Sequence, residues 1–117
     1  MTTRRMLIED FEVMMHARQA YLAWVAACER DGEAPAPVEL ERRRVLSEDS
    51  RLDGALFTEW ELNEEFDTAM CQALTWCHDR VEDDLALQGI PKPHLPLYIA
   101  QRKEAIRRVI ARLRGEF

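Results

Sequence analysis

The residues best suited to chemistry lie on one side of a long helical segment in the second half of the chain. Cys71 and His78 occur there with Asp67 and Glu82, and Asp67 lies four positions before Cys71 just as His78 lies four before Glu82. Side chains four apart on a helix are neighbours, so each pair could ligate one metal ion. One helix supplies only part of a closed tetrahedral site. We therefore assign no metal ligands, and we treat a metal- or small-ligand-binding helical bundle as the alternative function.

Other catalytic patterns are missing from the sequence. A di-iron carboxylate site in a bundle needs Glu-x-x-His pairs on two facing helices, and the sequence contains none. Cys77 and His78 are adjacent, but neighbours on a helix point about 100° apart and do not form a nucleophile and base. The four glycines are isolated, which excludes a Gly-rich phosphate loop. We predict a non-enzymatic protein with no catalytic residues and no cofactor.

A sequence signal for the start of a helix precedes these residues. Thr58 and Glu61 have the spacing of a capping box, and neither Gly nor Pro follows until Gly89. This pattern predicts one helix over residues 59–88, about 45 Å long at 1.5 Å per residue. Such a helix is longer than a compact chain of this size is wide, so we expect an elongated molecule.

Apolar periodicity predicts three further helices, over residues 4–30, 37–46 and 97–114. Gly32 and two prolines separate the first two, and three closely spaced prolines precede the last. No segment has the period of a strand. The sequence therefore predicts one all-α domain over residues 1–117, an elongated helical bundle of three long helices plus one short helix, with 4–30 and 59–88 as an antiparallel pair.

Three charged residues interrupt otherwise apolar helical stripes: Arg18, Arg80 and Asp84. An unpaired charge in a core is costly, and Arg80 and Asp84 are four apart. We expect these two to pair and to specify the register of the helices.

Charge is divided unevenly along the chain. There are 16 Lys and Arg residues against 22 Asp and Glu residues, a net charge of −6, yet the last helix is basic. An acidic chain repels polyanions, so we expect no direct nucleic-acid binding, and we expect the basic helix to lie against acidic residues of its own chain or of a sister chain.

The residues that we predict to contact a partner are Trp24, Trp60, Glu64 and Asp67. Both tryptophans fall outside the core stripes of their helices, whereas Trp76 falls on one, and tryptophan is enriched among interface hot spots. Glu64 and Asp67 belong to the acidic second face of the 59–88 helix.

We accordingly predict a protein-binding module, acting as an adaptor, inhibitor or assembly chaperone, and a homodimer. Acidic helices can also present carboxylates where a nucleic-acid-binding protein expects phosphates. The narrower hypothesis is a phosphate-mimic inhibitor of the kind encoded by phages or mobile elements.

The expected location is the cytoplasm. The three cysteines are odd in number and lack CxxC spacing, which favours reduced thiols. Acidic residues interrupt the segment after Arg4 and Arg5, so we expect neither a signal peptide nor membrane association.

Overall fold

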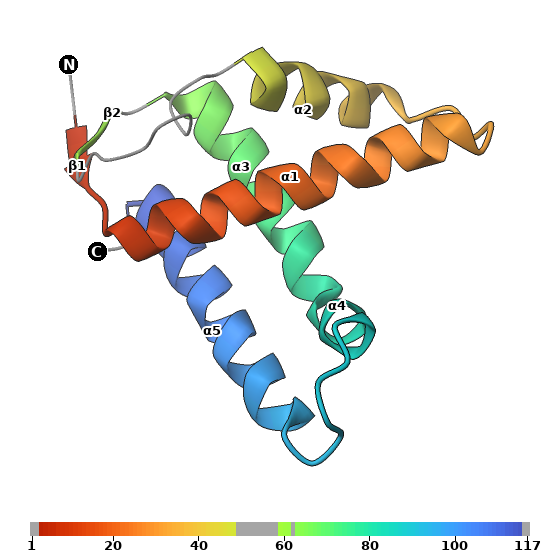
Figure 1. Ribbon diagram of the computed structural model, residues 1–117. Coiled ribbons are helices and arrows are strands. Elements are labelled where there is room, and N and C mark those ends of the chain that lie inside the picture. The colour runs from red at the N-terminus through yellow and green to blue at the C-terminus, as the bar shows by residue number, and fades with distance from the viewer. Residues whose placement is uncertain (1–2, 49–58, 62, 116–117) are drawn as a thin grey trace.

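The computed structural model describes residues 3–48, 59–61 and 63–115 (Figure 1). Its elements are β1 (Thr3–Arg5), α1 (Ile8–Arg30), α2 (Pro37–Glu48), β2 (Glu59–Glu61), α3 (Glu64–Asp79), α4 (Val81–Leu87) and α5 (Leu95–Leu113). The predicted all-α class is confirmed, since two three-residue strands are the only extended elements among the residues described.

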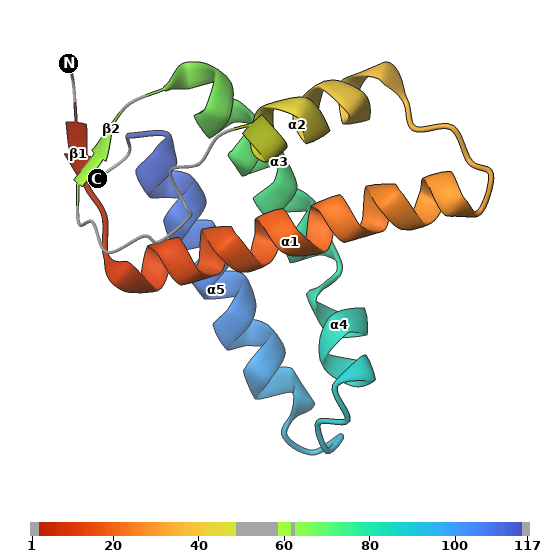
Figure 2. The same cartoon turned by 45° about the horizontal axis from the view of Figure 1, so that its top comes forward.

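Helix α1 lies across α3 and α5, and α2 turns back to pack on α3 and α1 (Figure 1, Figure 2). The predicted long antiparallel pair of helices is therefore wrong. Small residues explain the crossing: Ala17 of α1 and Ala73 of α3 are both buried, and the Cys77 Sγ lies 3.8 Å from the carbonyl oxygen of Ala17. Backbones that approach this closely can cross without large side chains holding them apart.

The predicted start of the 59–88 helix is also wrong. Thr58 lies outside the described residues, but Glu59–Glu61 form β2, which pairs antiparallel with β1 and places Trp60 opposite Arg4. Pairing with a strand at the N-terminal end of the chain is a non-local interaction that overrides the local helix signal.

Helix α3 instead begins at Glu64, after a different cap. Asn63 has extended backbone angles, and its side-chain oxygen accepts a hydrogen bond from the Phe66 amide at 3.1 Å. Three acidic side chains in the first turn, Glu64, Glu65 and Asp67, complement the positive end of the helix dipole.

Arg80 ends α3 and divides the predicted single helix in two. Its amide donates to the carbonyl of Cys77 at 3.0 Å, whereas its guanidinium donates to the carbonyl of Trp76 at 3.3 Å. In an uninterrupted helix the Arg80 amide would bond to the Trp76 carbonyl. The side chain thus replaces the backbone at that acceptor, and α4 begins at Val81.

The core forms where α1, α3 and α5 meet, with α2 contributing one side. The buried apolar residues of α1 and α5 are Phe11, Met14, Ala17, Tyr21, Val25, Ile106, Val109 and Leu113, whereas Leu7 and Ile8 at the start of α1 are exposed. None of the described helices is long and apolar enough to cross a membrane. The largest fully buried apolar side chains are those of Met6, Met14, Tyr21, Leu46, Phe66, Met70 and Leu74.

Candidate protein-binding surface

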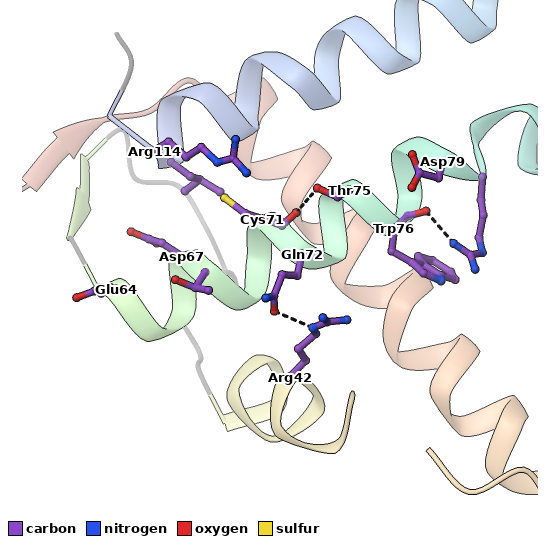
Figure 3. Close-up of a pocket in the computed structure, with 12 residues that line it drawn as sticks. Arg42, Glu64, Asp67, Cys71, Gln72, Thr75, Trp76, Asp79 and Arg114 are labelled. Carbon is purple, nitrogen blue, oxygen red and sulfur yellow. Dashed lines mark hydrogen bonds between the residues drawn. The ribbon is translucent and has the colours of Figure 1, made fainter. Parts of the chain in front are cut away.

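The outer face of α3 forms the floor of a groove between α2 and α5, which we call the α3 groove (Figure 3). Its volume is about 670 Å³. Positions three and four apart along α3 line it, so it follows one side of the helix for most of its length. The principal lining residues are Glu64, Asp67, Thr68, Cys71, Gln72 and Thr75, with Arg42 from α2 and Arg114 from beyond the end of α5.

A second cavity of about 650 Å³ continues this surface between α2 and α3. The two cavities share Arg42 and Gln72, so they form one surface. Three apolar side chains line the second cavity: Val45 and Ala69 are buried, whereas Val38 is 53% exposed. This part of the groove offers apolar area to a partner.

Polar side chains in the groove are held by hydrogen bonds. The Arg42 Nε donates to the Gln72 side chain at 2.7 Å, and its Nη1 donates to the Tyr21 hydroxyl at 3.5 Å. The Thr75 hydroxyl donates to the carbonyl of Cys71 at 2.8 Å (Figure 3). These bonds orient the groove before any partner arrives, which lowers the entropic cost of binding.

The edge formed by α2 and the start of α3 is acidic. Arg44 lies among three carboxylates, at 2.5 Å from Glu41, 3.0 Å from Glu48 and 2.7 Å from Glu65. The hydrogen bond from Arg44 lowers the pKa of Glu41, so that carboxylate stays ionised. One guanidinium cannot neutralise three carboxylates, and exposed Glu64 adds a fourth beside them.

An aromatic cluster lies at one end of the groove. The Trp24 and Trp76 ring centroids are 5.3 Å apart, and Tyr21 lies 5.9 Å from the first and 5.6 Å from the second. The Arg80 guanidinium carbon lies 4.5 Å from the Trp76 ring and 5.5 Å from the Trp24 ring, a cation–π arrangement. Trp76 and Arg80 both line the groove.

Arg80 does not form the ion pair with Asp84 that we predicted. Within the described residues, its guanidinium lies over the two tryptophan rings, and the Asp84 carboxylate lies 3.9 Å from His16 of α1. Stacking on the two aromatic rings therefore stabilises the charge of Arg80 in the apolar stripe, in place of the predicted ion pair with Asp84.

The structure brings together two of the four predicted contact residues. Glu64 is exposed at the rim of the groove, and Asp67 lines it although only 8% of its surface is exposed. Trp24 is half-buried against the core in the aromatic cluster, and Trp60 lies in β2. Their use by a partner stays a prediction.

Trp76 and Arg80 are among the groove residues that sequence reasoning did not select, as is Arg42. Trp76 was predicted to pack in the core, but it is only half-buried. The available signal was the arginine that interrupts an apolar stripe four positions after a tryptophan, a spacing at which the two side chains meet.

The pattern considered for a metal ion separates in the structure. Cys71 is buried in the groove, and His78 lies 3.3 Å from the Asp79 carboxylate. Among the described residues, no group of three or more His, Cys, Asp and Glu side chains is arranged to hold a metal ion.

The basic helix α5 lies against acidic residues of its own chain, as we expected. The Arg112 Nε is 3.3 Å and the Arg108 Nε 3.9 Å from the carboxylate of Asp10, which is fully buried. Arg108 also lies 3.9 Å from Glu9. These acids belong to the first turn of α1.

Comparison with known proteins finds no matching family model, and no curated protein or solved structure gives a significant match.

Proposed function

We propose that this chain is a non-enzymatic protein-binding module that engages its partner through the α3 groove, as an adaptor, inhibitor or assembly chaperone. The observation that carries the proposal is that one side of α3 lines a groove of about 670 Å³ between α2 and α5, which continues into a second of about 650 Å³. A groove bordered by helices suits an amphipathic segment of a partner protein.

The residue types in the groove support this proposal. Trp76, Arg80 and Arg42 line it, and tryptophan and arginine are enriched among the residues that contribute most binding energy at interfaces. Val38, which is 53% exposed, adds apolar surface, while Glu64 and neighbouring acids supply a charged rim. An apolar centre with a polar rim is the usual anatomy of a protein interface.

A phosphate-mimic inhibitor is the narrower form of the proposal. Exposed carboxylates along α3 and α4, including Glu64, Glu82 and Asp83, support it. Some of the acidity is compensated within the chain, because Glu65 pairs with Arg44. This form predicts that nucleic acid competes with the chain for the same partner.

A small-ligand-binding function is the second candidate. The groove volume of about 670 Å³ falls in the range of about 300–1,000 Å³ found for ligand sites. Elemental analysis and thermal unfolding with pools of small molecules test this candidate. A reproducible rise in unfolding temperature that Thr68→Trp removes would favour it over protein binding.

The experiment that tests the main proposal compares protein capture by the wild-type chain and by Thr68→Trp. Thr68 is exposed and lines both cavities, so an indole there fills the groove without disturbing the core. Gln19→Trp, at an exposed position of α1, is the matched control. Proteins captured from the native host by wild type and control should be lost with Thr68→Trp. Equal capture by all three chains would contradict the proposal.

A further inference from the structure

We propose that the partner segment that enters the α3 groove is acidic, and that one of its Asp or Glu carboxylates binds between Arg42 and Arg80 against the ring of Trp76. We call these two arginines the arginine clamp. The inference rests on the protein-binding function proposed above and names the chemistry of the partner at the same site. Both arginines line the groove, and no carboxylate of the described residues pairs with either of them.

Three consecutive arginines of α2 have different partners. Arg43 forms an ion pair with Glu29 of α1, and Arg44 lies among three glutamates. Arg42 alone of the three lines the groove, and it donates hydrogen bonds to a glutamine and a tyrosine side chain, which are both neutral. These bonds orient the Arg42 guanidinium but leave its charge uncompensated.

The charge of Arg80 is also left without a carboxylate partner within the described part of the chain. Its Nη1 donates to the Trp76 carbonyl at 3.3 Å, and its guanidinium carbon lies over the Trp76 and Trp24 rings. The adjacent acid, Asp79, lies 3.3 Å from His78. A cation–π contact stabilises a cation without neutralising it, so an approaching carboxylate still gains Coulomb attraction.

The two arginines lie on either side of Trp76 along the groove. Gln72, which accepts the bond from Arg42, precedes Trp76 by one helical turn, and Arg80 follows Trp76 by one turn. These two levels are about 12 Å apart along the helix axis, and the Arg80 guanidinium lies back over the Trp76 ring. Figure 3 shows Arg42 and Trp76 on the same side of α3. A carboxylate over Trp76 is therefore within reach of both guanidiniums, whose planar sets of N–H donors match carboxylate oxygens.

Most acidity of the groove lies at its other end. Glu64 and Asp67 are about 24 and 20 Å from Arg80 along the helix, at 1.5 Å per residue. The groove is thus negative at the start of α3 and positive beside the aromatic cluster. This difference sets the direction of a bound segment, because its acidic residue is favoured only at the arginine clamp.

The test selects peptides from a display library of random sequences with as many residues as the 16 of α3. A clamp variant carries Arg42→Gln and Arg80→Gln, and a matched control carries Arg30→Gln and Arg107→Gln. Arg30 and Arg107 are exposed and line neither cavity. Both variants lose two positive charges, and circular dichroism checks that their helices are retained. If Arg80→Gln lowers the helical signal, Arg42→Gln alone is compared with Arg43→Gln on the same helix.

Wild type and control should select peptides that share an Asp or Glu at one position. A chain of net charge −6 attracts cationic peptides non-specifically, so an acidic preference reports a specific site. Replacing that residue by Asn or Gln should weaken binding to wild type about tenfold or more in fluorescence anisotropy, because charge-assisted hydrogen bonds are lost. The same replacement should change binding to the clamp variant by less than about twofold, since the donors for the carboxylate are gone.

Selected peptides without a shared acidic position would overturn the inference. So would an amide replacement that weakens binding equally for wild type and clamp variant, or a library from which the wild type retains no peptide. Thr68→Trp separates this failure from failure of the proposed function. If Thr68→Trp loses peptides that carry no carboxylate, the groove binds protein segments and only the acidic partner is wrong. If Thr68→Trp binds the selected peptides as tightly as wild type does, the groove is not the binding surface.

Discussion

The buried carboxylate of Asp10 should be a large single contributor to the stability of the fold. It is fully buried, it accepts a hydrogen bond from the Leu7 amide at 3.2 Å, and it lies 3.3 Å from Arg112 and 3.9 Å from Arg108. Asp10→Ala therefore removes the bond that caps α1 and the anion that holds the basic helix α5.

The expected loss follows from these contacts. A hydrogen bond to a charged group contributes about 1.5–3 kcal/mol, and breaking a buried ion pair costs about 3–5 kcal/mol. The side chains of Arg108 and Arg112 are 36% and 24% exposed, so water compensates part of the second loss. We expect Asp10→Ala to lower the free energy of unfolding by about 2–4 kcal/mol.

Urea unfolding followed by circular dichroism measures this loss. Asp10→Asn keeps an acceptor for the Leu7 amide but lacks the charge, so its stability should lie between those of wild type and Asp10→Ala. Glu9→Ala is the matched control, because Glu9 is 75% exposed and 3.9 Å from Arg108, and surface pairs contribute about 0–1 kcal/mol. An Asp10→Ala chain as stable as the Glu9→Ala chain would refute the reasoning.

Further expected outcomes concern α3. Asn63→Ala should lower the free energy of unfolding by about 0.5–2 kcal/mol in urea titrations, since it removes the N-cap bond to Phe66; an unchanged midpoint would count against this cap. Trp76→Ala should lower it by about 2–3 kcal/mol, below the 3–5 of a fully buried aromatic, and should change the near-ultraviolet circular dichroism through loss of contact with Trp24; an unaltered spectrum would contradict the cluster. Burial raises the pKa of Cys77 from 9.0 to about 12, so at pH 9 the thiol should stay protonated and react with iodoacetamide far more slowly in the folded chain than in urea; equal rates would show that the thiol is accessible.

The order and approximate positions of most helices could be predicted, because the residues that separate the helices act locally in the sequence. Gly32 and the prolines near it separate α1 from α2, and the prolines from Pro91 to Pro96 precede most of α5. The predicted ends of these helices differ from the structure by a few residues. The buried apolar residues of α1 and α5 follow the three-and-four spacing that predicted these helices.

The limits of α3 could not be predicted because they depend on partners far away in sequence or on a single side chain. The sequence offers two possible N-caps, Thr58 and Asn63. Because Glu59–Glu61 pair with β1, the helix begins after Asn63. The end of α3 depends on the Arg80 guanidinium taking the Trp76 carbonyl, which no helix propensity describes.

The candidate site was likewise predictable only where it depends on local sequence signals. The acidic side of α3 that carries Glu64 and Asp67 was visible in the sequence, since it depends only on helical period. That this side lies in a groove, between Arg42 of α2 and Arg114 after α5, depends on how three helices pack. The rings of Trp24 and Trp76 pack together only because α1 crosses α3.

The most direct test of the protein-binding role is photo-crosslinking from the groove in the native host. A benzophenone amino acid at Thr68 should give a covalent adduct of discrete mass, because that position lines both cavities. The same amino acid at Gln19 of α1 should not. An adduct of twice the chain mass from Thr68 identifies a second copy, and a heavier or lighter discrete adduct identifies a different protein partner. Equal labelling from Thr68 and Gln19, or no adduct from Thr68, would contradict the claim that the α3 groove binds protein.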